Sequence, residues 1–465
     1  MTILAEAISR YHENLNTRSI AAESAERLES MLRREDLYFG DRPLCGVLRP
    51  RFMTHAQYRD VARACYEVGS AFEAVRRAAM SDSALRSRFC LTSWEEQVIH
   101  DDPGFRAASP TSRLDAFFAQ THRADHGSVS PHQSVAGLRF TEFNAETPAG
   151  GAYNDALANV FLMLPAMHAF SKTHAVFPIP AAPSIVQALL VAYHQWRGVH
   201  DRPEVCILDW LDVPTRSEFD LYARQFESLG ISVFVGDPRH AEYADGELRV
   251  DGKRVTLIYK RVLIDELVTR EGLDSPVVRA VRDNAVCMVN PFRCKLLHKK
   301  ASLAVVSDER TESLLTQEQR AAVAAHVPWT RVVEERYTKH DGRNIDLLPW
   351  IVDNRERLVL KPNDEYGGKG IVMGWTVDSE QWQEAVRGAL ATPHIVQERV
   401  EVPSEPWPAM LDNSLHIGER MLDTAPFLID GLTMQGCLTR IATDPLLNVT
   451  SGGGSNVPTF LVEPR

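Results

Sequence analysis

The sequence predicts a mixed α/β (α+β) protein with a helical N-terminal region and a central α/β layer. Apolar residues recur at steps of three and four from Tyr58 to Ala79, which marks one face of a helix. The apolar runs Val205–Leu208 and Ile231–Val235 are typical of buried strands, and the helical pattern between them favours a parallel crossover. A third observation is a pair of short apolar runs, at 358–360 and 371–373, joined by a glycine-bearing loop.

That glycine-bearing loop suggests a flap over phosphates. Lys361 ends the first apolar run, and Pro362 then stops the strand because it has no N–H to donate. Glycines let backbone N–H groups approach phosphate oxygens, and lysines supply positive charge. The loop matches neither the P-loop nor the dinucleotide fingerprint, so on its own a plain hairpin explains it equally well. Its candidate nucleotide-binding residues are Tyr366, Gly367, Gly368, Lys369 and Gly370.

Two earlier segments carry oxygen ligands at alternate positions. Side chains alternate along a strand, so Arg113 and Asp115 face one way on their strand, and Glu142 and Asn144 likewise on theirs. Three oxygen donors on two adjacent strands would suit Mg²⁺, which takes few carboxylates and shares its other positions with phosphate and water. Polar strand residues in contact with solvent are the alternative.

Composition and charge limit the classes of function. The 465 residues are enough for two to four structural domains, and 44% hydrophobic with 24% charged residues is ordinary for a globular protein. A net charge of −11 argues against non-specific binding to nucleic acid or acidic membranes. Seven scattered cysteines without C-x-x-C spacing argue against a zinc site or a disulfide framework. Without a signal-peptide pattern or a long apolar run, we expect a cytoplasmic protein.

Further cations stand at the ends of predicted elements. Lys260 and Arg261 follow a predicted strand at 255–259, after a hairpin turn at Asp251-Gly252. They are candidates for binding a substrate carboxylate, or they are a solvated strand end. A lysine cluster, with Lys299 and Lys300 at its end, precedes a predicted helix at 301–306.

Taken together, these motifs resemble the ATP-grasp superfamily, and specifically its circularly permuted branch. Glutathionylspermidine synthetase and eukaryotic-type glutathione synthetase belong to that branch. In most ATP-grasp enzymes the lysines and the glycine loop precede the R-x-D and E-x-N metal motifs. Here Arg113-x-Asp115 and Glu142-x-Asn144 come first. The resemblance covers residues 113 to 456, and the first hundred residues match no part of it.

The resemblance implies an ATP-dependent carboxylate–amine ligase. Such an enzyme joins a small-molecule or peptide carboxylate to an amine through an acyl phosphate and releases ADP and phosphate. ATP and Mg²⁺ are the implied cofactors, with Mg²⁺ held by Asp115, Glu142 and Asn144. Arg113 would stabilise charge on the transferring phosphoryl group. Lys361 and Arg440 are the other candidate catalytic residues.

The resemblance also assigns binding residues. Lys300 and Lys361 would contact the phosphates of ATP, with Lys299 as the alternative to Lys300. The adenine and ribose would meet a hinge segment with the candidates Gln397, Glu398, Val400 and Glu405. A second flap would cover the substrate, so the candidate substrate residues are Gly452, Gly453 and Gly454, beside Lys260 and Arg261.

The predicted organisation has five regions. They are a helical region (1–100), metal-binding strands (101–154), an α/β substrate layer (155–290), a nucleotide-binding region (291–400), and C-terminal strands with a lid loop (401–465). We expect no nucleic-acid or membrane partner, and a homodimer is the default oligomer. Two alternatives to a ligase stay open: an ATP-grasp phosphotransferase and a non-catalytic nucleotide-binding module. The identities of the acid and the amine are not readable from the sequence.

Overall fold

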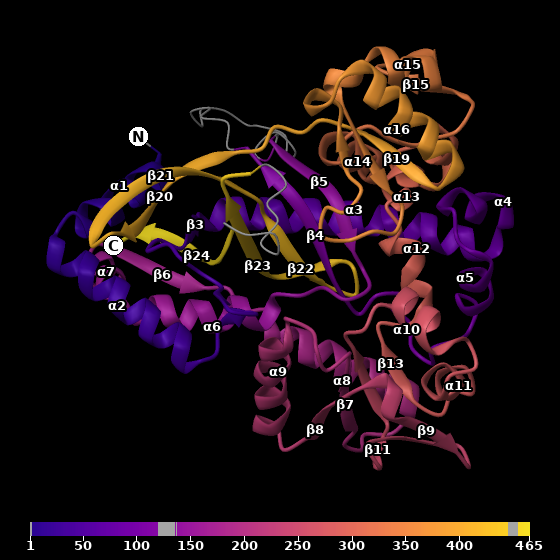
Figure 1. Cartoon of the computed structure of the whole chain (residues 1–465), viewed down its shortest axis with the longest axis horizontal. Coiled ribbons are helices and arrows are strands. Elements are labelled where there is room, and N and C mark those ends of the chain that lie inside the picture. Colours follow the sequence, from indigo (N-terminus) through magenta and orange to yellow (C-terminus); the bar gives the residue numbers. More distant parts are fainter. Residues whose placement is uncertain (1, 120–134, 136, 445–453) are drawn as a thin grey trace.

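The largest sheet of the protein draws strands from widely separated parts of the sequence (Figure 1). The computed structural model describes residues 2–119, 135, 137–444 and 454–465. Within these residues the sheet has nine strands, six of them in the order β20-β21-β23-β22-β4-β5, with β24 joining β23 to β3 and β6. Its strands are β3 (Arg51–Met53), β4 (Thr111–Phe118), β5 (Leu138–Asn144), β6 (His174–Pro178), β20 (Ser404–Leu411), β21 (Ser414–Leu422), β22 (Ala425–Ile429), β23 (Thr433–Ala442) and β24 (Ser455–Pro464).

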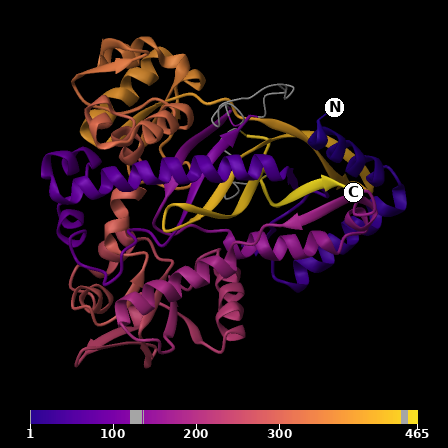
Figure 2. The same cartoon turned by 180° about the vertical axis from the view of Figure 1, so that it is seen from behind.

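The long helix α3 (His55–Ser81) crosses the back of this sheet (Figure 2). It begins with a capping box in which the Thr54 side chain accepts from the Gln57 backbone N–H and Gln57 reciprocates. The apolar face that the sequence predicts is buried there, from Val61 to Ala79, and packs with β4, β5 and α14 (Gln317–His326). The helical prediction for this stretch is therefore confirmed.

The rest of the first hundred residues is largely, but not wholly, helical. Helices α1 (Ile3–Leu15), α2 (Arg18–Arg34), α4 (Ser83–Arg86) and α5 (Ser93–Val98) accompany α3. The chain between α2 and α3 forms the small hairpin of β1 (Tyr38–Phe39) and β2 (Arg42–Pro43), and β3 pairs in parallel with β24. The predicted helical region thus also contains three short strands, which the sequence does not reveal because runs of two or three residues give no readable alternation.

A second, parallel sheet forms the predicted α/β layer. Its order is β13-β12-β7-β8 and all its neighbours are parallel. Its strands are β7 (Glu204–Leu208), β8 (Ser232–Gly236), β12 (Leu257–Lys260) and β13 (Cys287–Val289). Its helices are α8 (Ala182–Arg197), α9 (Arg216–Ser228), α10 (Ile264–Glu271) and α11 (Pro276–Arg282). The predicted parallel pairing of β7 and β8 is confirmed.

One strand boundary in this layer is a correction. The sequence predicts a single strand at 255–259, but the structure splits it at Thr256. The first part belongs to β11 (Lys253–Val255), which closes the predicted Asp251-Gly252 hairpin with β10 (Glu247–Val250). The second part is β12 in the parallel sheet. A continuous apolar run cannot show that its two halves pair with different sheets.

A third sheet carries the glycine-bearing loop. Its order is β14-β19-β17-β18, with β14 (Thr330–Val332), β17 (Leu358–Pro362), β18 (Val372–Met373) and β19 (His394–Glu398). The antiparallel pair of β17 and β18 confirms the predicted strand–loop–strand segment. Helices α15 (Leu347–Asp353) and α16 (Ser379–Ala391) pack on this sheet around the buried Trp382. Two short helices, α12 (Lys295–His298) and α13 (Ala301–Val306), connect it to the parallel layer. The five-region division of the chain stays a prediction.

Gly69 lets α3 lie directly against the turn between β22 and β23. A Cβ atom at Gly69 would lie 2.1 Å from the carbonyl oxygen of Gly431. We expect Gly69→Ala to lower the free energy of unfolding by about 1–3 kcal/mol, because a well-packed core does not accept an added methyl group. Urea unfolding of the purified chain measures this change.

The matched control is Gly388→Ala in α16, where an added Cβ would meet nothing within 4 Å. Removing a glycine from a helix interior should raise stability there by about 0.5–1 kcal/mol. Equal effects of the two substitutions would contradict the close approach at Gly69.

Candidate functional site

The antiparallel pair β4–β5 brings the first set of predicted residues together. In its register Arg113 lies opposite Asn144 and Asp115 opposite Glu142, with an irregularity directly after Asp115. The Asn144 side-chain amide donates to Asp115 Oδ2 at 3.0 Å. The pairing expected from the alternating polar pattern is therefore confirmed.

Asp115 is buried between two guanidinium groups. Arg113 Nε lies 2.6 Å from its Oδ1, and Arg440 Nη2 lies 2.7 Å from its Oδ2. Burial raises the pKa of the Asp115 carboxyl, but Arg113 and Arg440 outweigh burial and hold the pKa well below its usual range. Arg440 is itself fixed by Asp423, through Nε and the backbone N–H. The candidate catalytic arginines Arg113 and Arg440 are thus neighbours that share one carboxylate, that of Asp115.

Lys300 reaches the same strand pair from the N-terminal end of α13. Its Nζ lies 2.8 Å from Glu142 Oε1 and donates to the Glu365 carbonyl oxygen at 2.6 Å. Burial raises the pKa of Glu142, but Lys300 outweighs burial, and the net shift is downward. Lys299 points elsewhere, to Glu95 and Asp364. Of the two lysines that the sequence leaves in competition, Lys300 is the one that contacts the strand pair.

Lys361 also faces this strand pair. At the end of β17, its Nζ donates to Gln397 Oε1 at 2.8 Å and to the Thr141 carbonyl oxygen at 3.3 Å. Gln397 is held in turn by Thr330. Burial lowers the pKa of Lys361 to about 8, although the Glu142 carboxylate opposes the shift. Among the described residues, the Lys361 ammonium donates to neutral oxygens only, and no carboxylate lies within ion-pair distance of it.

The loop after β17 has the backbone that its glycines predict. Gly367, Gly368 and Gly370 have φ of 64°, 80° and 71°, a region that residues with a Cβ atom rarely adopt. The exposed Lys369 pairs with Glu365 at 3.2 Å, and the Tyr366 hydroxyl donates to Glu266 Oε1 at 3.3 Å.

The hinge candidates have partners of their own. Glu398 lies 2.9 Å from His340 Nε2, and Val400 is half-buried beyond the end of β19. Glu405, on β20, is bound by the buried Arg49 and Arg51. The nucleotide-binding role assigned to these residues stays a prediction, and the two arginines count against it for Glu405.

Lys260 and Arg261, the candidates for a substrate carboxylate, are both buried. Lys260 Nζ lies 3.6 Å from Glu146 and Arg261 Nη2 lies 3.1 Å from Glu218. Their role in substrate binding stays a prediction, and these internal ion pairs count against it. In the second predicted flap, Gly452 and Gly453 lie outside the described residues, whereas Gly454 directly precedes β24.

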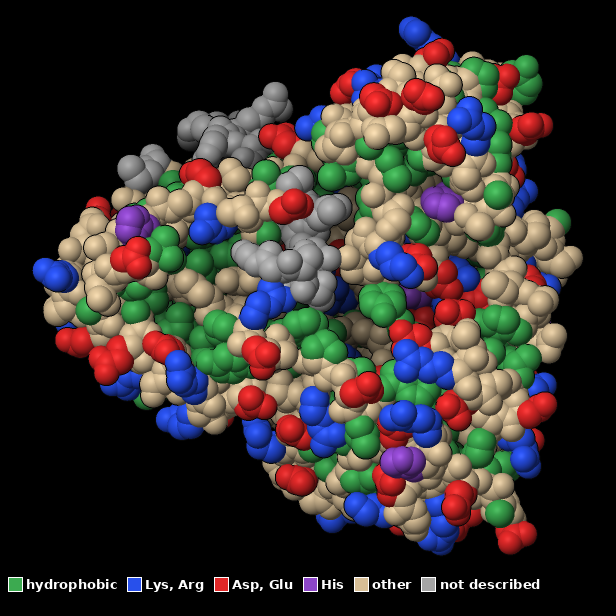
Figure 3. Space-filling model, viewed as in Figure 1, with side chains coloured by type: hydrophobic (Ala, Val, Ile, Leu, Met, Phe, Trp, Pro, Cys, Tyr) green, Lys and Arg blue, Asp and Glu red, His purple; other side chains and the backbone are tan. Residues whose placement is uncertain are grey.

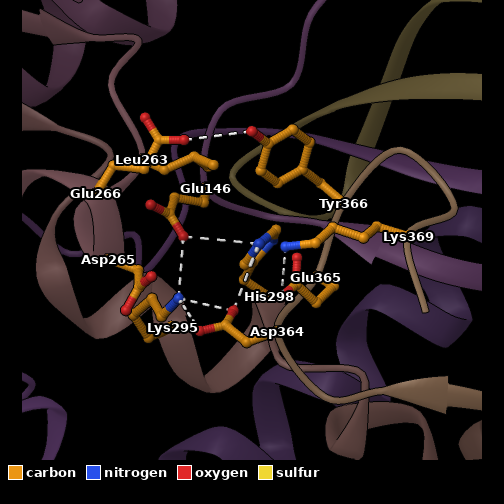
Figure 4. A pocket seen from close by; sticks show the side chains of 10 residues that line it. All are labelled: Glu146, Leu263, Asp265, Glu266, Lys295, His298, Asp364, Glu365, Tyr366 and Lys369. Carbon is orange, nitrogen blue, oxygen red and sulfur yellow. Dashed lines mark hydrogen bonds and ion pairs between the residues drawn. The ribbon is translucent and has the colours of Figure 1, made fainter. Parts of the chain in front are cut away.

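A cavity of about 180 Å³ adjoins these residues, and most of its lining was missed from the sequence (Figure 4). It lies between α10, α12 and the glycine-bearing loop, and Figure 3 shows acidic and basic side chains meeting around a hollow on this face. The buried Lys295 pairs there with Glu146 at 3.3 Å and with Asp364 at 2.7 Å. The sequence did offer a clue to Glu146 and Asp364, because each lies a few positions after a recognised motif. The lining residues are Glu146, Leu263, Asp265, Glu266, Lys295, His298, Asp364, Glu365, Tyr366 and Lys369.

The donor set fits a magnesium ion that shares its ligands with phosphate and water. Among the described residues, no group of three or more His, Cys, Asp or Glu is arranged to hold a metal ion. Asp115 already accepts hydrogen bonds from Arg113, Arg440 and Asn144, whereas Glu142 is partly exposed. One carboxylate and one amide oxygen are enough for Mg²⁺ when phosphates complete the shell. The three-ligand site of Asp115, Glu142 and Asn144 stays a prediction.

The arrangement of elements places the chain in a known fold class. A glutathione synthetase-like effector from Globodera pallida, solved in its apo form, superposes with a TM-score of 0.57 at 12% sequence identity. The match covers 95% of this chain and 97% of that one. The chain therefore has a mixed α/β fold like that of this glutathione synthetase-like effector, and the mixed α/β fold class that the sequence predicts is confirmed.

Two curated proteins are similar in sequence. One, named "Putative glutamate--cysteine ligase 2-2", from Frankia casuarinae, is 25% identical over 77% of this chain and 43% of its own length. Another, "Putative glutamate--cysteine ligase 2-3" from Frankia alni, is 24% identical over 89% of this chain and 46% of its own length. The chain thus spans less than half the length of these relatives. No known family model matches it. In the described part of the chain, no helix is long and apolar enough to cross a membrane.

We expect Asp115→Asn to lower the free energy of unfolding at pH 7 by about 3–5 kcal/mol, because it leaves two guanidinium groups without their shared carboxylate. The folded pKa of Asp115 lies below its unfolded value of about 3.9. Its stabilisation is therefore complete above that value and is lost as the pH falls further towards the folded pKa. Urea unfolding of both proteins at pH 7, 4 and 3 should show their difference shrinking only below about pH 4.

Asp220→Asn on α9 is the control, since Asp220 forms an exposed pair with Arg216 at 3.7 Å. It should change stability by less than about 1 kcal/mol. A similarly small effect of Asp115→Asn at pH 7 would contradict the role of Asp115 in holding the two arginines.

Proposed function

We propose that this chain is an ATP-dependent carboxylate–amine ligase of the circularly permuted ATP-grasp type. It activates a carboxylate as an acyl phosphate and joins it to an amine, with release of ADP and phosphate. The observation that carries the proposal is the convergence of Lys300 and Lys361 on the β4–β5 pair, which bears Glu142 and Asn144. The glutathione synthetase-like fold and the ligase names of the sequence relatives support it.

The site suits a triphosphate because it holds positive charge without a matching anion. The Lys361 ammonium donates only to neutral oxygens in the described chain, so a phosphate oxygen would supply its missing counter-ion. Lys300 would exchange part of its contact with Glu142 for phosphate. In the bound state Glu142 and the Asn144 amide oxygen would hold Mg²⁺, which neutralises charge on the transferring phosphoryl group.

The arginines would act on the acyl group. Asp115 and Asp423 fix the guanidinium groups of Arg113 and Arg440 before any substrate arrives. Fixed positive charge stabilises a developing oxyanion without reorganising during the reaction. The 364–370 loop would close over the acyl phosphate and exclude water, and glycines, which have no Cβ atom, allow its backbone the change of conformation that closure needs.

Hydroxylamine provides the test of the reaction class. Incubation of the chain with Mg-ATP, hydroxylamine and each of a panel of carboxylic acids should yield a hydroxamate for at least one acid. The same acid should accelerate ADP release, because the activated carboxyl is captured by an uncharged nucleophile. ADP release that no acid accelerates, or a phosphorylated product that persists after ADP release, would contradict the ligase proposal.

Glu142→Gln should lower the rate of ADP release at least about 100-fold, since the lost charge acts where phosphoryl charge develops. Nucleotide affinity should change only a few-fold, because Lys300 and Lys361 remain. Steady-state kinetics and calorimetric titration with a non-hydrolysable ATP analogue measure the two effects. Glu384→Gln, at an exposed position of α16, is the control and should behave as the unmodified chain does. Near-normal turnover in Glu142→Gln would refute the assignment.

A further inference from the structure

The cavity of about 180 Å³ beside the candidate nucleotide site has no role in the proposed phosphoryl transfer. It shares a wall with that site, because the Glu365 carbonyl oxygen accepts from Lys300 while Glu365 also lines the cavity. Figure 4 shows its charged side chains converging from α10, α12 and the loop after β17. A molecule in the cavity would therefore lie next to the candidate nucleotide site.

The cavity also lies at the edge of the parallel sheet where a ligand is expected. In the sheet order β13-β12-β7-β8, the chain runs from β7 to its outer neighbour β8 at one edge, and from β12 to its outer neighbour β13 at the opposite edge. The two neighbouring strands β7 and β12 thus form a topological switch point, and ligands of open α/β sheets bind outside the carboxyl ends at such a point. Leu263, Asp265 and Glu266, which line the cavity, directly follow β12.

The charge of the cavity is negative on balance. Five carboxylates line it, against the two lysines Lys295 and Lys369 and one histidine. Burial lowers the pKa of His298 to about 4, so its imidazole is neutral at pH 7. Ion pairs with lysines outside the lining balance the buried carboxylates: Lys260 with Glu146, and Lys299 with Asp364.

Asp265 is the exception to this balance. Glu266 has Arg270 and Tyr366 as partners, and Glu365 has Lys369. Of the five lining carboxylates, Asp265 alone has no hydrogen-bond or ion-pair partner among the residues that the structure describes. Lys295 and Lys299 act on the Asp265 carboxylate only at longer range, and its side chain is exposed at the rim of the cavity, on the side formed by α10. This carboxylate is therefore free to form a direct ion pair with a bound cation.

We propose that this cavity binds the protonated amine of the second substrate, with the ammonium group beside Asp265. The inference rests on the proposed ligase function and names the class of its amine substrate. An amine without a neighbouring carboxylate fits best, because a second negative charge would face five carboxylates while the buried Lys295 is already occupied by Glu146 and Asp364. This preference would separate the chain from an enzyme whose acceptor is a free α-amino acid.

Cysteamine and cysteine form a matched pair of probes, since they differ only by the carboxylate. Calorimetric titration in the presence of Mg-ADP should show cysteamine binding at least about tenfold more tightly than cysteine. The carboxylate of cysteine would be repelled by the lining carboxylates, and an unfavourable charged contact weakens binding by that order. Asp265→Asn should weaken cysteamine binding about tenfold. It should leave hydroxamate formation unchanged, because hydroxylamine is uncharged and forms no ion pair with Asp265. Glu271→Gln, on the same helix but outside the cavity lining, is the control and should bind as the unmodified chain does.

The two proposals fail in different ways. Hydroxamate formation together with equal binding of the two probes, or with unchanged cysteamine binding by Asp265→Asn, would overturn the ammonium site and leave the ligase intact. The expected binding preference without hydroxamate from any acid would support a cation site and refute the ligase.

Discussion

The ion pair between Lys300 and Glu142 joins two segments far apart in sequence, and the geometry of the candidate site depends on it. Glu142 belongs to a sheet strand, whereas Lys300 starts the short helix that leads to the third sheet. Through its second contact, to the Glu365 carbonyl oxygen, Lys300 also holds the start of the glycine-bearing loop. One ammonium group therefore contacts both the strand pair and the loop that lines the cavity.

A second set of buried charges supports this arrangement. Lys295 contacts Glu146, Asp364 and Glu95, which come from the nine-stranded sheet region, the loop and helix α5. Burying an ammonium group is unfavourable unless carboxylates compensate it, so these elements cannot separate without leaving a charge unpaired. The pKa values show the compensation: burial raises the pKa of Glu146, but Lys295 and Lys260 outweigh it and the net shift is downward. Lys361, with neutral partners only, stands apart from this pattern.

The sequence was informative where the signal was local. Alternating polar residues predicted the β4–β5 pair, and the glycines and Pro362 predicted the loop after β17. The sequence was less informative where a structure depends on residues far away along the chain. The edge strand β20 contains Pro406 and Pro408, which disguise a strand and are tolerated only at an edge. Lys295 could not be told from a solvated lysine, because its counter-ions come from positions 95, 146 and 364.

The interleaving of the large sheet has a consequence for how the chain acquires its structure. Strand β4 pairs with β22, more than 300 positions later, and β3 pairs with β24. During synthesis β3 and β4 cannot pair with β24 and β22 until those late strands have emerged from the ribosome, so their backbone N–H and C=O groups stay unpaired on that side. Contacts of such long range slow folding and leave unpaired edges exposed to association with other chains. Chaperones would therefore matter more to the yield of this protein than its ordinary composition suggests.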